Sequence, residues 1–268
     1  MSSPSADPDL ELRTASAPDS TGPPLLFVHG AYVGAWCWAE HFLPALADHG
    51  YTAHALSLRG HGASGGSLTT ASIDDFVADL RRVVARLDAP PILVGHSMGG
   101  VVVQRYLKRY DAPGAVLMAS LPPQGMAGLT FQFACADPSL WLGFGALQAF
   151  GPGFTSPRVV RRALFSDDVP DDRLATYASQ VTQESPCALA ELAGPVVTGR
   201  LPRDVRTLVV GAEEDAIVPS WAVEATARAF GTDATFVSGV AHAMMLDTGW
   251  ERSLQVLVDW LEGDASGT

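Results

Sequence analysis

The sequence predicts an α/β fold, in which helices cover both faces of a mostly parallel sheet. Two observations predict it: short, continuously apolar runs that suit buried strands, and longer segments of helical period that alternate with these runs. A third observation predicts an insertion, because residues 121–202 contain proline and glycine breaks, aromatic side chains and helix-like fragments but no strand pattern. We therefore predict one sheet with an inserted helical cap.

The expected strands are short and mostly apolar. They are the segments 25–28, 51–57, 91–94, 115–118, 207–210 and 235–237. A strand inside a parallel sheet is buried on both faces, so a run without polar alternation suits it. Only the segment 51–57 alternates, and it does so weakly.

The expected helices lie between or after these strands. Apolar side chains recur at three- and four-residue steps from Ile73 to Leu87, and Ser72 and Asp74 mark the start of this helix. Residues 101–110 form the next expected helix, and apolar residues between 254 and 261 indicate a C-terminal helix.

The size of the chain fits one domain with a large buried core, because 47% of its 268 residues are hydrophobic and 17% are charged. We expect a flexible N-terminal segment at 1–20, which is rich in Ser, Asp and Pro. The core is expected to combine residues 21–120 and 203–268, with the cap at 121–202 between them.

The formal net charge of −12 bears on partners. A chain this acidic repels phosphate backbones and anionic lipid surfaces, so we expect neither nucleic acid nor a membrane as a partner. Residues 1–20 also lack the apolar stretch of a signal peptide, which favours a cytoplasmic protein. Both a monomer and a homodimer are compatible with this sequence.

The three cysteines, Cys37, Cys135 and Cys187, are too few and too scattered for a disulfide framework. None of them has a Cys or His neighbour at the spacing of zinc ligands. We therefore expect a reduced protein with no metal site.

The motif Gly95-His96-Ser97-Met98-Gly99 joins the strand expected at 91–94 to the helix expected at 101–110. A serine on such a sharp turn exposes its hydroxyl oxygen, and glycine two residues to either side avoids a collision. The helix that begins there also directs N–H groups and its positive dipole end at the same place. Ser97 is therefore the candidate nucleophile.

A serine hydroxyl attacks well only when a neighbouring base takes its proton. For a nucleophile on this kind of turn, an acid and then a histidine follow the serine along the chain. Of the seven histidines, only His242 comes after Ser97, and it follows the strand expected at 235–237. His242 is therefore the candidate base.

Three acidic residues follow the strand expected at 207–210, namely Glu213, Glu214 and Asp215. We favour Asp215, because the apolar sequence Ile217-Val218-Pro219 after it would hold its side chain inward. Asp247 is a weaker alternative, since it follows His242 and so breaks the usual order. The acid would fix the histidine tautomer and stabilise its cation.

Acyl transfer passes through an oxyanion that needs preorganised hydrogen-bond donors. One expected donor is the backbone N–H of Met98, which follows the nucleophile. The other is the N–H of Ala31, because Gly30 lets the backbone turn toward the site after the strand at 25–28. We expect His29 to bond within this loop, since buried polar groups are normally paired.

Several of these motifs together resemble the α/β-hydrolase superfamily over residues 25–261, except in the cap. They are His29-Gly30-Ala31, Gly34-Ala35-Trp36-Cys37-Trp38, Arg59-Gly60-His61-Gly62-Ala63-Ser64, Gly95-His96-Ser97-Met98-Gly99-Gly100, Asp215 and Val240-Ala241-His242. The stretch from His29 to Trp38 resembles the small esterases related to hydroxynitrile lyases. The resemblance implies an eight-stranded sheet with a lid, and no metal or cofactor.

The departures from the family pattern are informative. Ser97 stands where dehalogenases and epoxide hydrolases carry an aspartate. Hydroxynitrile lyases have Thr in place of Gly30 and Lys in place of Ala243, so this chain resembles a hydrolase rather than a lyase of cyanohydrins. The loop that begins at Arg59 is usually preceded by Asp, and Ser57 at that place puts a structural hydrogen bond in doubt.

The resemblance and the candidate residues together predict a serine hydrolase of the carboxylesterase type (EC 3.1.1), acting on a small-molecule ester. The Phe, Trp and Leu residues of the cap favour small to medium apolar substrates. Thioesters, lactones and carbon–carbon bonds are alternative substrates for the same three residues. A ligand-sensing protein that retains these residues is the alternative of another class.

Overall fold

The structure is a computed structural model that describes residues 8–20, 22–125, 138–151 and 156–263. Within them, seven strands form one sheet in the order β1-β3-β2-β4-β5-β6-β7. Their bounds are β1 Leu12–Ala15, β2 Leu25–Val28, β3 Ala53–Leu56, β4 Ile92–His96, β5 Ala115–Met118, β6 Thr207–Ala212 and β7 Ala234–Val237. All neighbouring strands are parallel except β1, which runs antiparallel to β3. The predicted mostly parallel sheet is confirmed.

Two expectations about the sheet need correction. The described residues contain seven strands, not the eight that the resemblance implied. The segment 1–20, expected to be flexible, contains the edge strand β1, in which Leu12 lies opposite Leu56. The side chains of β1 are mostly exposed. An exposed edge strand is joined to its sheet largely through backbone hydrogen bonds. Its sequence therefore lacks the run of apolar residues that predicts a buried strand.

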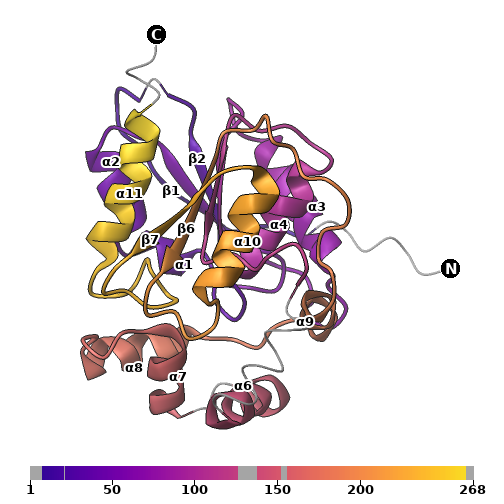
Figure 1. Cartoon of the computed structure of the whole chain (residues 1–268), viewed down its shortest axis with the longest axis vertical. Coiled ribbons are helices and arrows are strands. Elements are labelled where there is room, and N and C mark those ends of the chain that lie inside the picture. Colours follow the sequence, from indigo (N-terminus) through magenta and orange to yellow (C-terminus); the bar gives the residue numbers. More distant parts are fainter. Residues whose placement is uncertain (1–7, 21, 126–137, 152–155, 264–268) are drawn as a thin grey trace, which may run out of the picture.

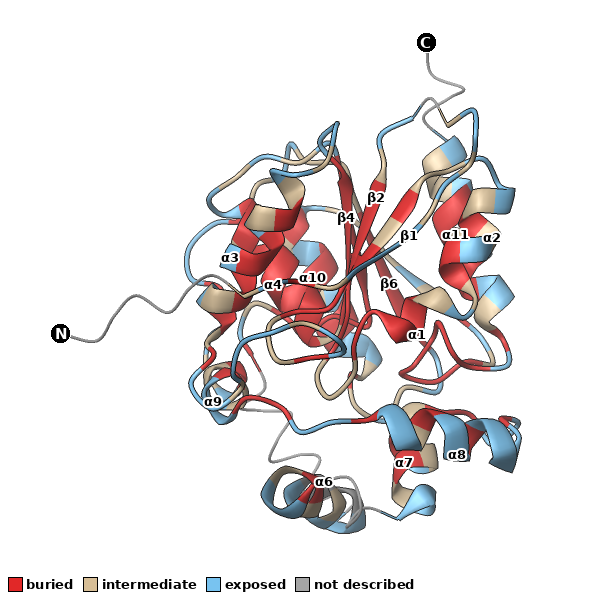
Figure 2. Cartoon of the chain, turned by 180° about the vertical axis from the view of Figure 1, so that it is seen from behind, coloured by how far each residue is buried: buried red, intermediate tan, exposed pale blue. Residues whose placement is uncertain are grey.

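Helices cover both faces of the sheet (Figures 1 and 2). One face carries α3 (Ile73–Val84), α4 (Met98–Leu107) and α10 (Ser220–Phe230). The other carries α1 (Trp36–Ala39), α2 (Phe42–Asp48) and α11 (Trp250–Glu262). Alternate residues of β2 point to opposite faces, so Leu26 packs in one core cluster and Phe27 in the other.

Helix α3 shows how the sequence sets a helix start. The Ser72 hydroxyl accepts the N–H of Asp75 at 3.1 Å, and the Asp75 carboxylate accepts the N–H of Ser72 at 2.9 Å. This reciprocal capping satisfies two N–H groups that the first turn leaves without helical partners. The predicted start at Ser72 is confirmed.

Between β5 and β6 the described residues form four helices and no strand. These helices are α6 (Pro138–Phe150), α7 (Pro157–Leu164), α8 (Asp171–Gln180) and α9 (Pro186–Ala193). They lie together beyond one end of the sheet (Figure 1). The segments 126–137 and 152–155, with Cys135, lie outside the described residues. We call α6–α9 and their linkers the cap; its boundaries at 121 and 202 stay a prediction.

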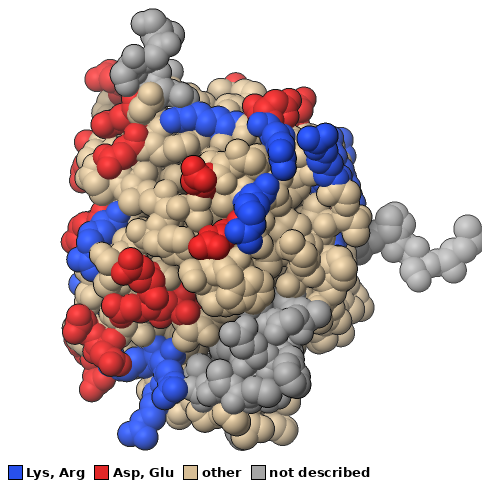
Figure 3. Space-filling view, in the orientation of Figure 1, with Lys and Arg blue, Asp and Glu red and all other residues tan. Residues whose placement is uncertain are grey.

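The surface carries many more acidic than basic side chains, in line with the net charge of −12. On the face shown in Figure 3, Asp and Glu side chains gather mainly along the side where α11 lies. Among the described helices, none combines the length and the apolar character needed to cross a lipid bilayer.

Candidate active site

Ser97 sits on the turn between β4 and α4, with φ 53° and ψ −118°. A positive φ is uncommon for a residue other than glycine, and here it turns the hydroxyl out of the sheet edge. Gly95 and Gly99 make this turn possible. A Cβ atom at Gly95 would collide with the backbone of Gly99, and one at Gly99 with the carbonyl oxygen of Val28. The glycine spacing noted in the sequence thus has a steric cause.

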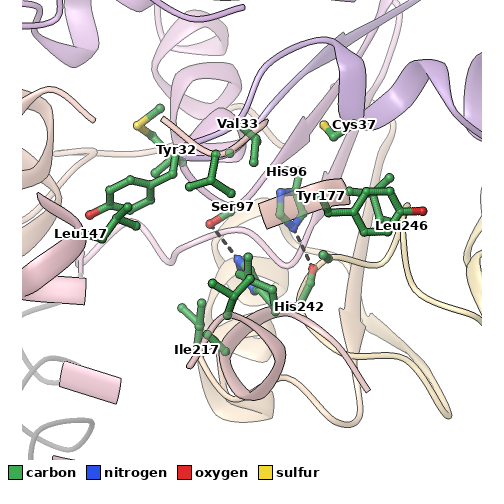
Figure 4. A pocket seen from close by; sticks show the side chains of 18 of the residues that line it. Tyr32, Val33, Cys37, His96, Ser97, Leu147, Tyr177, Ile217, His242 and Leu246 are labelled. Atoms are coloured by element: carbon green, nitrogen blue, oxygen red, sulfur yellow. Dashed lines mark hydrogen bonds between the residues drawn. The ribbon is translucent and has the colours of Figure 1, made fainter. Parts of the chain in front are cut away.

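The structure brings Ser97, His242 and Asp215 together from three loops that follow β4, β7 and β6. The Nε2 atom of His242 lies 3.1 Å from the Ser97 hydroxyl (Figure 4). Its Nδ1 atom lies 2.8 Å from the Asp215 carboxylate. A carboxylate only accepts, so Nδ1 carries the proton and Nε2 is free to accept from Ser97. The side chains of His242 and Asp215 are 4% and 1% exposed, which shields this chain of bonds from water.

Asp215 is held by its own loop. Its second carboxylate oxygen accepts the N–H groups of Ile217 and Val218, each at 2.8 Å. Backbone N–H groups of the sequence after Asp215 therefore hold its carboxylate in place. Glu213 and Glu214 are exposed instead.

Asp247, the weaker alternative, is buried but serves another contact. Its carboxylate accepts the N–H of Ala241 at 3.1 Å and the N–H of Thr248 at 2.7 Å. It also accepts both the N–H and the hydroxyl of Ser166, in the linker between α7 and α8. Asp247 thus joins the loop of His242 to the cap. From the sequence, Asp247 is only an acidic residue five positions after His242, and nothing there indicates its contact with Ser166.

Ala31 and Met98 both line the cavity above Ser97. Among the described residues, neither of their N–H groups has a hydrogen-bond partner. Gly30 allows the loop to approach, because a Cβ atom there would lie 2.9 Å from Nδ1 of His96 and 3.1 Å from Cβ of Ser97. The two N–H groups are therefore available to an oxygen bound next to Ser97.

Two buried histidines hold the loops around Ser97. The Nε2 atom of His29 accepts the N–H of Leu58 at 3.0 Å, and its Nδ1 donates to the carbonyl of Gly30 at 2.7 Å, as predicted for a bond within this loop. Burial lowers the pKa of His29 well below its ordinary value. His96 donates from Nε2 to the carbonyl of His242 at 2.9 Å. Burial, with the nearby His242, lowers the pKa of His96 to about 3.

Ser57, where the resemblance to the family put a structural hydrogen bond in doubt, is itself hydrogen-bonded on two sides. Its hydroxyl accepts the N–H of Ala35 at 2.9 Å and donates to the Glu11 carboxylate at 2.6 Å. Glu11 also accepts the N–H of Ala63 at 2.9 Å. A serine and a carboxylate from the N-terminal segment thus act together at this place, and the sequence pattern gave no indication of Glu11.

A cavity of about 440 Å³ opens above Ser97. Its lining comes from the core and from all four helices of the cap, and includes Trp36, Leu121, Leu147, Phe165, Tyr177 and Leu246. Figure 4 shows Tyr32 and Leu147 on one side of Ser97, and Tyr177 and Leu246 on the other. Among the described lining residues there is no Asp, Glu, Lys or Arg. The cavity therefore suits an uncharged, largely apolar molecule.

Comparison with known proteins places this fold and site in a family. The model of the alpha/beta hydrolase family matches residues 25–256, which is most of the chain. The chain therefore belongs to the alpha/beta hydrolase family, and the resemblance noted in the sequence is confirmed.

The matches with curated relatives cover about two fifths of the length of this chain. The non-heme chloroperoxidase of Kitasatospora aureofaciens is 36% identical over 106 residues, or 38% of this chain and 38% of that protein. Methyl jasmonate esterase 1 of Vitis vinifera is 35% identical over 112 residues, or 41% of this chain and 42% of that protein. The matched part thus spans well under half of the length of these relatives.

Solved structures match over nearly the whole chain. An esterase from Thermogutta terrifontis has a TM-score of 0.76 and 20% identity, and covers 95% of this chain and 93% of its own. A bromoperoxidase from Bacillus anthracis has a TM-score of 0.78 and 19% identity, and covers 96% of this chain and 97% of its own. At these identities the likeness is one of fold.

Proposed function

We propose that this chain is a serine hydrolase that cleaves carboxylic esters through an acyl-enzyme on Ser97. The observation that carries the proposal is the continuous chain of two hydrogen bonds from Asp215 through His242 to Ser97, at 2.8 and 3.1 Å. This arrangement supplies a nucleophile, a base and an orienting acid within direct contact.

The proposed reaction begins when Ser97 Oγ attacks the ester carbonyl carbon and its proton passes to Nε2 of His242. Asp215 stabilises the resulting imidazolium. The carbonyl oxygen becomes an oxyanion, and in this proposal the N–H groups of Ala31 and Met98, two residues that line the cavity, stabilise it. The C–O bond to the alcohol then breaks, and His242 returns its proton to the departing oxygen.

The second half of the reaction releases the acid. Water gives a proton to His242 and attacks the acyl carbon on Ser97, which forms a second oxyanion. This collapses to the carboxylic acid as His242 protonates Ser97 Oγ. The balance is ester and water to acid and alcohol, so the residues named here suffice without any further reactant.

The cavity supports an apolar ester as substrate. Its lining is largely aliphatic and aromatic, and its described residues include no Asp, Glu, Lys or Arg. Transfer of a charged group into such a lining is costly, so we propose neutral acyl and alcohol parts. The relatives named methyl jasmonate esterase 1 and methylesterase 18 support an ester in preference to a thioester, a lactone or a carbon–carbon bond.

The test is hydrolysis of p-nitrophenyl esters, from acetate to octanoate, by the wild-type chain and by Ser97→Ala. We expect continuous turnover by the wild type with a preference for one acyl length, and a loss of more than about 1000-fold in the variant. Release of a single equivalent of nitrophenol by the wild type would instead support a ligand-sensing protein. Unchanged turnover by Ser97→Ala would overturn the assignment of the nucleophile.

A further inference from the structure

The loop that carries the proposed oxyanion donor is bonded to the cap. We call residues 30–32 the oxyanion loop. The N–H of Tyr32 donates to a carboxylate oxygen of Glu184 at 3.3 Å. The carbonyl of Tyr32 accepts the N–H of Thr182 at 2.8 Å. Thr182 and Glu184 both lie in the linker between α8 and α9. The cap thus bonds both the N–H and the carbonyl of Tyr32 in the oxyanion loop.

Tyr32 needs such support because its φ is 69°, in the left-handed region. A bulky side chain rarely adopts this conformation, and it persists only where the surroundings fix it. Ala31, the proposed oxyanion donor, lines the cavity and directly precedes Tyr32. The bonds from Thr182 and Glu184 therefore fix the backbone next to the donor.

Glu184 is itself held firmly. Its side chain is fully buried, and the oxygen that accepts from Tyr32 also lies 2.9 Å from Nε2 of His61. The other oxygen accepts the N–H of Ser185 at 2.6 Å. The second ring nitrogen of His61 faces the carbonyl oxygen of Arg59 at 3.1 Å. Both ring nitrogens of His61 thus lie within hydrogen-bond distance of an oxygen atom, which fixes the ring beside Glu184.

The backbone of Glu184 links a further part of the cap to this point. Its carbonyl accepts from the amide of Gln148 at 2.9 Å, and its N–H donates to the same side chain at 3.3 Å. Gln148 belongs to α6, whose Leu147 lines the cavity. Glu184, in the α8–α9 linker, thus bonds both α6 and the oxyanion loop.

We propose that Glu184 is a positioning residue for the reaction at Ser97: its carboxylate, anchored by His61, fixes the oxyanion loop through the N–H of Tyr32. The inference rests on the proposed acyl transfer. Glu184 does not line the cavity and has no contact with Ser97 or His242 among its described bonds. It therefore acts through the oxyanion loop and not through direct contact with the substrate.

The variant Glu184→Gln keeps the shape of the side chain but turns one acceptor oxygen into a donor. At least one of the N–H groups of Tyr32, His61 and Ser185 then loses its acceptor. We expect kcat to fall about tenfold or more, since removal of a whole oxyanion donor typically costs about 100- to 1000-fold and this change only displaces one. KM is expected to change less than kcat, because Glu184 itself does not line the cavity.

A pair of ketones separates this role from simple structural support. With a trifluoromethyl alkyl ketone, Ser97 Oγ adds to the carbonyl carbon, its proton goes to His242, and the ketone oxygen becomes an oxyanion in the same place as in the reaction. The matching methyl ketone reports occupancy of the cavity alone. We expect Glu184→Gln to weaken inhibition by the fluorinated ketone by the same factor as kcat, and to leave inhibition by the methyl ketone unchanged.

Glu191→Gln is the matched control. Glu191 is also a cap carboxylate, but it bonds Arg105 and the N–H of Ile73 on the α3 and α4 side, away from the oxyanion loop. We expect this variant to keep wild-type kcat and wild-type inhibition by both ketones. Equal losses in the two variants would overturn the specific role of Glu184.

Two further results would overturn the inference, and they are distinguishable. A Glu184→Gln enzyme with a lower melting temperature but wild-type kcat and fluorinated-ketone inhibition would show a purely structural residue. A wild-type enzyme that neither turns over esters nor binds the fluorinated ketone would overturn the proposed function, and this inference with it. If Glu184→Gln does not fold, Glu184→Asp serves instead. It keeps the charge but withdraws the carboxylate from both Tyr32 and His61, so we expect a loss in the same two readouts.

Discussion

The Nε2 atom of His96 lies 2.9 Å from the backbone carbonyl oxygen of His242, so the residue before the candidate nucleophile holds the candidate base by its main chain. The two rings are 4.8 Å apart, centre to centre. A cationic ring at His96 would repel the imidazolium that forms on His242. The full burial of His96, which lowers its pKa to about 3, keeps it neutral at the pH at which His242 must act.

This pKa predicts a dependence of folding stability on pH. An unfolded histidine has a pKa of about 6.5, so between about pH 3 and 6.5 the unfolded chain binds a proton at His96 that the folded chain does not. The free energy of unfolding must therefore fall as the pH is lowered through this window. We expect His96→Gln to reduce the slope by up to about 1.4 kcal/mol per pH unit. Urea unfolding between pH 7 and 5 measures this. A slope equal to that of the wild type would contradict it, and exposed His49→Gln is the control.

Asp215 is predicted to contribute through His242 and not through the fold. Asp215→Asn keeps the shape of the side chain but removes the charge that orients the ring, so we expect kcat to fall by about three orders of magnitude, less than for Ser97→Ala. Glu214→Gln, a neighbouring change of the same kind in an exposed residue, is expected to leave kcat unchanged. The measurement is kcat for ester hydrolysis by the two folded variants. A loss in Glu214→Gln that matched the loss in Asp215→Asn would refute the choice of Asp215.

Gly30 is predicted to be intolerant of any side chain. In Gly30→Ala the new methyl group would lie 2.9 Å from Nδ1 of His96 and 3.1 Å from Cβ of Ser97, which pushes the oxyanion loop away from the nucleophile. We expect a loss of kcat of about 100-fold, as for a misplaced donor. Gly194→Ala, where a Cβ atom meets nothing within 4 Å, should change stability by less than about 0.5 kcal/mol and leave kcat intact. Wild-type kcat in Gly30→Ala would show that the loop accommodates the methyl group.

Glu11 is predicted to stabilise the junction of β1 with the loop after β3. Burial would raise the pKa of Glu11, but hydrogen bonds from Ala63 N–H, Ser57 and Arg13 outweigh it and lower the pKa. Its contribution to stability is therefore present above its ordinary pKa of 4.5 and lost as the pH falls below that value. We expect Glu11→Gln to cost about 1 kcal/mol at pH 7 and less at pH 3. Unfolding at the two pH values tests this, and an equal cost at both would contradict the role of the charge. Glu224→Gln, at an exposed position of α10, is the control.

Much of this arrangement could be predicted because it is written in local patterns. The apolar run of β4, the glycine spacing around Ser97 and the capping residues before α3 each act over a few neighbouring positions. The choice of Asp215 over Glu213 and Glu214 also followed from a local feature, the apolar residues after it. Strand β1 escaped prediction because its side chains are mostly exposed, so no burial pattern marks it.

The remaining contacts join residues that lie far apart in the sequence. Glu11 meets Ser57, Ser166 meets Asp247, and Tyr32 meets Glu184, the last pair 152 positions apart. No periodicity relates such positions, because their meeting depends on how whole strands, loops and cap helices pack against each other.

The sequence by itself determined the kind of sheet, the turn that exposes Ser97 and the order of the three candidate residues, since local sterics and hydrophobic period dictate these features. Only the tertiary structure decided which carboxylates hold the loops around them. A buried carboxylate is stable only where several donors converge on it, and that convergence exists only once Glu184, Asp247 and their distant partners are folded together.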